Sequence, residues 1–260
     1  MEVVIAEERT LAELAADAVE RLLHTEAAPV LGLATGSSPL RIYDELTSRH
    51  TNDGLSFAHA QAFMLDEYVG IADDHPQRYR NVIDAQIAAR VDFAQGAVHG
   101  PEGSAADLAA ASAEYEEAIA EVGGIDLQIL GIGTDGHIAF NEPGSSLASR
   151  TRVKTLTKQT RLDNARFFDG DVDQVPPLCL TQGLGTIMEA KHLVLIATGG
   201  TKAEAVHQMI EGPISAMWPA TVLQMHPHVT VLIDDAAASR LQLADYYRHS
   251  YANKPDWQHL

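Results

Sequence analysis

The sequence predicts an α/β protein with a Rossmann-like, mainly parallel sheet and helices on both of its faces. Short apolar runs of strand length alternate with longer segments in which apolar residues recur at helical spacing. Alternation of this kind is typical of a parallel sheet that helices cover on both sides. Loops rich in glycine, hydroxyl groups or acids follow directly after four of the runs, and open α/β sheets bind ligands at this end of their strands.

The expected elements alternate from the N-terminus onward. A strand is expected at residues 3–5, and Thr10 is expected to cap the following helix, with Glu13 completing a capping box. Pro39 is expected in the first turn of a helix at 40–47, where its fixed φ is favourable. The other expected strands are residues 30–34, 60–65, 127–130, 192–197 and 229–233. The other expected helices are residues 78–89, 107–122, 201–211 and 236–248.

No linker, repeat or low-complexity segment divides the chain, so residues 1–260 are predicted to form one domain. Residues 149–178 carry many polar groups and few periodic apolar residues. A structureless stretch of that length is uncommon inside a compact domain. We therefore expect either a lid over the functional site or short helices that the pattern does not locate.

The composition limits the classes of partner. The chain has a formal net charge of −18, which argues against nucleic acids and anionic membranes as main partners. The single cysteine, Cys179, cannot form an internal disulfide bond and is expected to be a buried, small apolar residue. The N-terminus lacks the pattern of a signal peptide, and no apolar run is long enough to span a membrane. These features predict a cytoplasmic protein.

Two of the loops could bind an anion. In TGSSP, Gly36 would allow close approach of a phosphate, and Ser37 and Ser38 would add hydroxyl groups near backbone N–H groups of a helix start. In TGGTK, Lys202 falls in the expected first turn of a helix, where a cation opposes the helix dipole unless an anion is bound. The alternatives are a simple helix cap and a solvated surface lysine.

Two other loops could transfer protons. Asp66 ends an apolar strand, where partial burial would raise the pKa of its carboxyl group and suit it to take a proton from carbon. His137 lies between Asp135 and Glu142, which could fix its tautomer and orientation. Each residue also has a purely structural interpretation. Asp66 could be an acid at the end of a strand that bonds to neighbouring backbone N–H groups, and His137 could be a structural histidine. No group of cysteines and histidines has zinc-ligand spacing, so no metal is expected.

The sequence resembles the glucosamine-6-phosphate deaminase family. The segments that carry the resemblance are LDEYVG at 65–70, GIGTDGHIAFNEPGSSLASRTR at 131–152 and RFFDGDVDQVP at 166–176, with TGSSP, TGGTK and LQMHP in matching order. The resemblance implies a Rossmann-like fold and conversion of glucosamine 6-phosphate and water to fructose 6-phosphate and ammonia. It implies a cytosolic role in amino-sugar catabolism and no metal or organic cofactor.

The resemblance also assigns roles to individual residues. It implies that Asp66 moves a proton from C2 to C1 and that His137 opens the pyranose ring, with Asp135 and Glu142 positioning the imidazole. The resemblance also implies that the substrate phosphate is held by Gly36, Ser37, Ser38, Arg166 and Lys202. Arg166 falls in the polar segment 149–178, which is then interpreted as a substrate lid.

Allosteric members of the family are hexamers that bind N-acetylglucosamine 6-phosphate between subunits. The residues that match their effector site are Ser145, Arg152, Lys154 and Thr155. A C-terminal tyrosine completes that site, and its ungapped position holds Arg248 here. Apart from this one position, the match to the effector site implies a homo-oligomer and an effector.

Two alternatives remain open. The first is 6-phosphogluconolactonase, a related hydrolase that also has a DGH loop, although Glu142 and the Asp66-Glu67-Tyr68 segment favour the deaminase. The second is a catalytically silent sugar-phosphate sensor. The full acid/base set and the lack of a DNA-binding segment argue against a sensor.

Overall fold

The computed structural model describes residues 1–255, 258 and 260. Within them, seven strands form one sheet in the order β1-β10-β9-β6-β2-β3-β5, and all of its neighbouring strands are parallel. The mainly parallel sheet expected from the sequence is therefore confirmed. The strands are β1 (Glu2–Ile5), β2 (Val30–Leu33), β3 (Gln61–Met64), β5 (Val98–His99), β6 (Leu127–Leu130), β9 (His192–Ala197) and β10 (Val229–Ile233).

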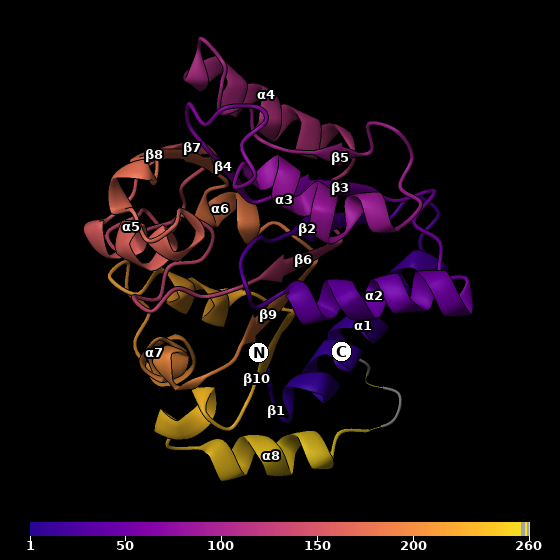
Figure 1. Cartoon of the computed structure of the whole chain (residues 1–260). Helices are drawn as coiled ribbons and strands as arrows, with labels where there is room; N and C mark the ends of the chain where they lie inside the picture. The colour runs from indigo at the N-terminus through magenta and orange to yellow at the C-terminus, as the bar shows by residue number, and fades with distance from the viewer. Residues whose placement is uncertain (256–257, 259) are drawn as a thin grey trace.

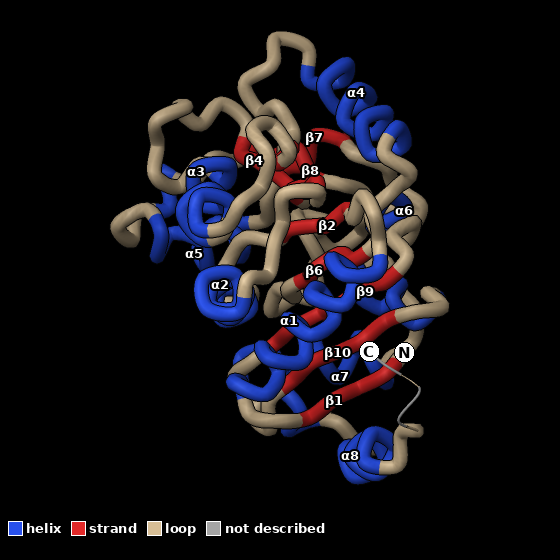
Figure 2. The backbone as a smooth tube through the Cα atoms, turned by 90° about the vertical axis from the view of Figure 1, so that its right-hand side faces the viewer, coloured by secondary structure: helices blue, strands red, loops and turns tan. Residues whose placement is uncertain are grey.

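Helices cover both faces of this sheet, as expected. Helices α1 and α2 lie side by side against one face, α7 lies against the other, and α8 runs along the edge strand β1 (Figures 1 and 2). The helices are α1 (Glu8–Thr25), α2 (Leu40–Asp53), α3 (Tyr79–Gln86), α4 (Leu108–Glu121), α6 (Leu184–Ile187), α7 (Ala203–Glu211) and α8 (Ala244–Ala252). None of the helices in the described ranges is long and apolar enough to cross a lipid bilayer.

The core lies between the sheet and these helices. Strands β2, β6, β9 and β10 are buried over their whole length, which is why their sequences are apolar on both faces. On α1 the buried positions include Leu11, Ala15 and Val19, which recur every four residues along one face. Each fully buried Leu or Val side chain stabilises the fold by about 1.5–3 kcal/mol.

A second, smaller sheet was not expected from the sequence. It is antiparallel and consists of β4 (Asp66–Tyr68), β8 (Leu178–Thr181) and β7 (Arg152–Thr155) in the order β4-β8-β7. Thr181 at the end of β8 lies opposite Asp66 on one side and opposite Arg152 on the other. The small sheet therefore joins the end of β3 to the polar segment 149–178.

That polar segment contains short elements. After β7 come α5 (Lys158–Asn164) and the 3-10 helices η2 (Ala165–Phe167) and η3 (Val172–Gln174). Phe168 of this segment packs edge-on against Tyr68 of β4, with ring centroids 5.8 Å apart. The short helices that the pattern did not locate are thus present, and the segment packs against the strand that begins at Asp66.

Several of the expected helix boundaries are wrong. The helix expected at 40–47 extends to Asp53 and begins after Pro39, and the helix expected at 78–89 ends at Gln86. Helix α1 begins at Glu8, so Thr10 lies inside its first turn, and Glu13 pairs with Arg9 at 2.7 Å instead of completing a capping box. The helix expected at 236–248 is divided into the 3-10 helix η6 (Ala237–Arg240) and α8. At this break the carboxylate of Glu211 accepts hydrogen bonds from the backbone N–H groups of Gln242 and Leu243 at 2.8 and 2.9 Å.

The position of Cys179 agrees with its expected role. It lies in the middle of β8 with no exposed surface. Burial raises the pKa of its thiol well above the ordinary value, and the nearby Asp66 and Glu142 act in the same direction. A buried thiol held in its neutral form is unreactive.

Candidate active site

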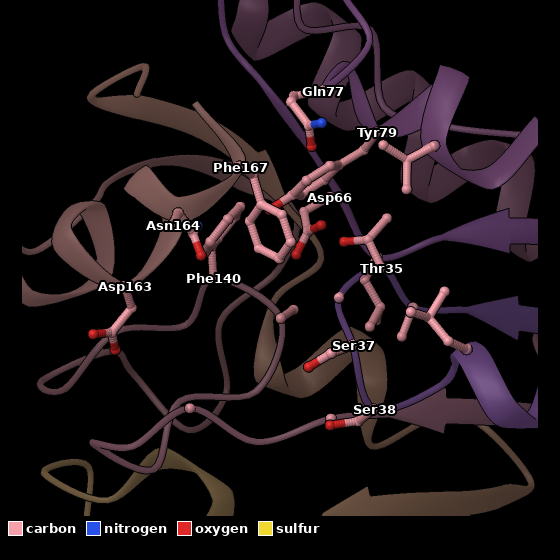
Figure 3. Close-up of a pocket in the computed structure, with 18 of the residues that line it drawn as sticks. Thr35, Ser37, Ser38, Asp66, Gln77, Tyr79, Phe140, Asp163, Asn164 and Phe167 are labelled. Carbon is pink, nitrogen blue, oxygen red and sulfur yellow. The ribbon is translucent and has the colours of Figure 1, made fainter. Parts of the chain in front are cut away.

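The four predicted loops meet at one cavity at the carboxyl ends of β2, β3, β6 and β9. The cavity has a volume of about 430 Å³. Its wall includes the loop after β2, the residue that begins β4, the loop after β6, the turn after β9, and residues of α5 and η2 (Figure 3). Because this volume is typical of small-molecule sites, the cavity is a candidate active site.

Asp66 is the buried acid of this cavity. Its side chain points into the cavity, with Phe140 and Phe167 on one side and Thr35 on the other (Figure 3). Asp66 is only 6% exposed, and no hydrogen-bonding or ion-pair partner of its carboxylate occurs among the described residues. Burial, reinforced by the negative charge of Glu67, raises the pKa of its carboxyl group well above the ordinary value. Such a carboxylate is a stronger base than an exposed aspartate.

Glu67 has a different role from its neighbour. Its carboxylate accepts hydrogen bonds from the backbone N–H groups of Tyr68, Tyr79 and Arg80 at 2.8–2.9 Å. Tyr79 and Arg80 are the first residues of α3, where backbone N–H groups have no partner within the helix. Glu67 therefore caps α3 and fixes that helix to the strand that carries Asp66.

His137 contacts both acids that the sequence placed around it. Its Nδ1 atom lies 2.7 Å from Asp135 Oδ1 and 3.7 Å from Glu142 Oε2. The imidazole lies in the cavity wall, whereas Asp135 and Glu142 are outside the wall and behind the ring. Burial acts to raise the pKa of Asp135, but the hydrogen bonding and charge of His137 outweigh it and lower that pKa below the ordinary value.

Glu142 is the more buried of the two acids. One carboxylate oxygen accepts a hydrogen bond from the backbone N–H of Thr157 at 2.9 Å. The other oxygen, Oε2, faces His137 Nδ1, and both atoms are buried without a well-aligned hydrogen-bond partner in the described part of the chain. Both acids therefore lie on the Nδ1 side of the imidazole, where they can fix its orientation.

These three side chains also form a group that could hold a metal ion. Their ligand atoms all lie within 4.8 Å of one another. The sequence pattern does not predict this group, because its members are two carboxylates and one histidine without zinc-ligand spacing. A requirement for metal is therefore tested together with the proposed activity.

The predicted phosphate ligands all line the cavity. They are Gly36, with φ of 98°, Ser37, Ser38, Arg166 and Lys202. Lys202 is the last residue of the 3-10 helix η4 (Gly200–Lys202), directly before α7, and not inside the first turn of a longer helix as expected.

Lys202 and Arg166 form an electropositive end of the cavity. Burial lowers the pKa of Lys202, and repulsion from Arg166 lowers it further, against the attraction of Asp163 and Asp135. Neither cation has an ion pair with a carboxylate among the described residues, although acids outnumber basic residues 36 to 18 in the chain. Two adjacent cations without acidic partners, beside hydroxyl groups, suit a dianionic phosphate.

The predicted effector residues lie outside the cavity. Arg152 and Lys154 project from the same face of β7, an edge strand, and neither has an ion pair in the described ranges. Thr155, on the other face of β7, is exposed. Ser145 is buried, and its hydroxyl donates to the backbone oxygen of Glu142 at 2.6 Å.

The sequence did not point to several residues of the site. Thr35, Tyr79, Phe140 and Asn164 line the cavity, and the Tyr68 hydroxyl accepts hydrogen bonds from Tyr79 and Asn164 at 3.2 and 3.0 Å. Asn164 belongs to α5, so these bonds hold the polar segment to the strand of Asp66. The only local signal was that Tyr68 and Phe140 belong to segments that already contained acids.

The fold and the site together define a class of protein. A parallel α/β sheet whose strand ends present a buried carboxylate, a histidine contacted by two acids, and a cavity wall with two cations and hydroxyl groups is suited to acid/base chemistry on a phosphorylated small molecule. The chain belongs to the family described as glucosamine-6-phosphate isomerases/6-phosphogluconolactonase, whose model matches residues 6–232.

Two full-length relatives and one solved structure are similar to this chain. The chain is 69% identical over 261 residues to a glucosamine-6-phosphate deaminase of Beutenbergia cavernae, covering 100% of both chains. It is 69% identical over 259 residues to one of Mycolicibacterium smegmatis, covering 99% of both. A solved structure described as a monomeric glucosamine-6-phosphate deaminase superposes with a TM-score of 0.90 at 41% identity, covering 92% of this chain and 99% of that one.

A more distant structure shares the fold. The 6-phosphogluconolactonase from Trypanosoma cruzi has a TM-score of 0.72 at 19% identity, covering 93% of this chain and 97% of that one. The resemblance to the deaminase family that the sequence motifs indicated is confirmed by the family match and by the full-length relatives.

Proposed function

We propose that this protein is a glucosamine-6-phosphate deaminase, which converts glucosamine 6-phosphate and water to fructose 6-phosphate and ammonia. The observation that carries the proposal is the placement of Asp66, His137 and Lys202 in the wall of one cavity. Relatives that are 69% identical over the full length and named for this activity support it.

The first step is ring opening. With the phosphate held by Lys202, Arg166 and the serines of the TGSSP loop, His137 transfers a proton between the hydroxyl group at C1 and the ring oxygen. The pyranose opens to the free aldehyde. Asp135 and Glu142 contact the opposite edge of the imidazole and stabilise the imidazolium as it forms.

The second step moves a proton between carbon atoms. Asp66 removes the proton from C2 while the aldehyde oxygen at C1 takes up a proton from water, which gives an enolamine. Asp66 then returns its proton to C1, and the amino group loses a proton to water. The product is a ketimine at C2. Water adds to this ketimine, and the C–N bond breaks to release ammonia and leave the ketone of fructose 6-phosphate. One carboxylate serves the carbon atoms and a separate histidine serves the ring, so neither group has to move between distant atoms.

The test is release of ammonia from glucosamine 6-phosphate by the purified protein. We expect release without added metal and in the presence of a chelator, because every step uses groups of the protein and water. Loss of activity on chelation, with recovery on adding a divalent metal, would instead assign a metal to the Asp135–His137–Glu142 group. Hydrolysis of 6-phosphogluconolactone without reaction of the amino sugar would contradict the proposal, and so would binding of sugar phosphates without turnover.

Replacing Lys202 by methionine should raise KM by about tenfold to a hundredfold, because a hydrogen bond to a charged group contributes about 1.5–3 kcal/mol. We expect little change in kcat, since the phosphate is held equally in substrate and transition state. Steady-state kinetics would measure both constants. The matched control is Lys158→Met, which removes an exposed cation of α5 outside the cavity wall. A lower kcat with unchanged KM would contradict the phosphate assignment.

The effector site and the oligomeric state remain proposals. We propose that N-acetylglucosamine 6-phosphate binds at Ser145, Arg152, Lys154 and Thr155 in a homo-oligomer, with a hexamer as the form that the resemblance implies. Arg152 and Lys154 form no ion pair with a carboxylate within the described ranges, which supports an anion site on β7, whereas the 41% identical relative is described as monomeric. Rate curves with and without this sugar phosphate, together with light scattering, test both.

A single cysteine and a phosphorylated substrate support our further proposal of a cytoplasmic location.

A further inference from the structure

A buried polar network begins beside the strand that carries Asp66. Gln182 follows β8 directly and has no exposed surface. Its backbone N–H donates to the Leu65 oxygen at 2.8 Å, and its Nε2 donates to the Met64 oxygen at 3.0 Å. Gln182 therefore holds the two residues that precede Asp66 in the chain.

The same network reaches the loop that carries His137. Asn141 also has no exposed surface, and its Nδ2 donates to the backbone oxygens of Gln182 and Ile138 at 2.8 and 3.1 Å. The backbone N–H of Phe140 donates to the hydroxyl of Thr181 at 3.1 Å. The His137 loop is thus fixed to the same two residues, Thr181 and Gln182, as the strand of Asp66.

A third contact connects this network to β7. Arg152 donates to Oδ1 of Asn141 at 3.0 Å. The carboxamide of Asn141 therefore uses both its donor and its acceptor, and no other side chain of this size presents both groups in this geometry. A fully satisfied polar group in the interior specifies one arrangement of its neighbours.

The main sheet does not pair the two catalytic segments directly. Asp66 follows β3 and His137 follows β6, and β2 lies between these strands in the sheet. Their separation depends on contacts beyond the strand ends, where Asn141 and Gln182 form the connection. Because misplacement of a catalytic group by 1 Å can cost about a hundredfold in rate, this connection bears directly on turnover.

We propose that Asn141 is a positioning residue whose carboxamide sets the separation of Asp66 and His137, with Arg152 holding that carboxamide from β7. The proposal rests on the proposed deaminase activity, in which both groups act on one sugar. Asn141 does not line the cavity, so it acts through the two segments and not on the substrate.

Asn141→Asp is the decisive variant, because it keeps the size and the acceptor for Arg152 but removes the donor to Gln182 and Ile138. We expect kcat to fall about tenfold to a hundredfold. KM should change by less than about threefold, since the phosphate contacts are untouched. Arg152→Gln, at a half-buried position, should lower kcat in the same direction by a smaller factor and should add little to Asn141→Asp.

The matched control is Gln224→Ala. Gln224 also donates from its carboxamide to two backbone oxygens, those of Met209 and Gly212, at 2.9 Å, but it lies outside the cavity wall. The Gln224→Ala variant should have a lower melting temperature and an unchanged kcat. Wild-type kcat in folded Asn141→Asp, or a rise in KM equal to the fall in kcat, would overturn the proposal, as would equal losses of kcat in the Gln224 control.

Hydrogen exchange measured by mass spectrometry tests the connection without relying on activity. In Asn141→Asp, and more weakly in Arg152→Gln, peptides covering 64–68 and 138–142 should both lose protection, while Gln224→Ala should leave both unchanged. If the wild-type protein releases no ammonia, the proposed function fails, and exchange alone decides whether Asn141 joins the two segments. Unchanged exchange in both peptides would overturn that connection whatever the activity.

Discussion

Asp66→Asn should lower the turnover of glucosamine 6-phosphate by about a thousandfold or more, near the upper range measured for loss of a general base. The variant keeps the shape of the side chain but cannot accept the proton from C2. Asp163 is the other carboxylate in the cavity wall, and it lies apart from Asp66 beyond Asn164 and Phe140 (Figure 3). Steady-state assays of ammonia release would measure the loss.

Stability provides the control for this variant. The pKa of Asp66 is raised in the folded protein, so folding favours its protonated form. At pH values above that raised pKa, the buried carboxylate destabilises the fold, and the neutral asparagine removes this cost. We therefore expect Asp66→Asn to have an equal or higher melting temperature at neutral pH and to bind inorganic phosphate normally. Residual activity close to the wild-type value would show that another group is the base.

The raised pKa of Asp66 also determines one limb of the pH profile. The residue acts as a base only when ionised, so kcat/KM should fall as the pH falls through its pKa. Because that pKa lies above the ordinary value for aspartate, the acid limb should lie at higher pH than an exposed aspartate would give. A pH–rate profile of the wild-type protein would measure it.

His137→Gln should slow the reaction of the cyclic substrate by about a hundredfold to ten-thousandfold, because it removes the group that relays protons at the ring oxygen. An analogue that lacks the hydroxyl groups needed for ring closure should lose less than about tenfold, since Asp66 still performs the carbon step. The measurement is kcat/KM of both substrates with wild-type and variant protein.

The structure supplies a second way to test the same histidine. Its ring packs against the α-carbon of Gly133, where an added Cβ would lie 2.3 Å from His137 Cε1. Gly133→Ala should therefore displace the ring and reproduce the selective loss on the cyclic substrate. Equal losses on cyclic and open-chain substrates, in either variant, would argue against ring opening as the role of His137.

Six strands of the main sheet could be predicted from the sequence because they are largely buried and mostly apolar, whereas the two-residue edge strand β5 was missed. The small sheet could not be predicted. The RVKT sequence of β7 alternates between half-buried and exposed residues at the edge of a three-stranded sheet, so it carries no apolar signal. Its pairing with β8 depends on contacts between distant parts of the chain.

The residues of the candidate site also differ in whether they could be predicted from the sequence. Residues with distinctive chemistry, such as Asp66 and His137, could be predicted because Asp66 ends one apolar run and His137 lies in the loop that follows another. Asn141 and Gln182 could not, because a buried amide is distinguished only by the partners that folding brings to it. The position of Asp135 and Glu142 outside the cavity wall could not be predicted either. Their spacing along the loop does not show which side of the imidazole they contact.

The pairing of β1 with β10 has a consequence for synthesis of the protein. Glu2 lies opposite Thr230, so β1 pairs with a strand that is synthesised much later in the chain. At roughly 5–20 residues per second, β1 and the apolar face of α1 wait on the order of ten to fifty seconds for their partner. During this interval the nascent chain exposes apolar surface that chaperones bind. Slow translation of the C-terminal third would lengthen the period in which the unfinished chain can aggregate.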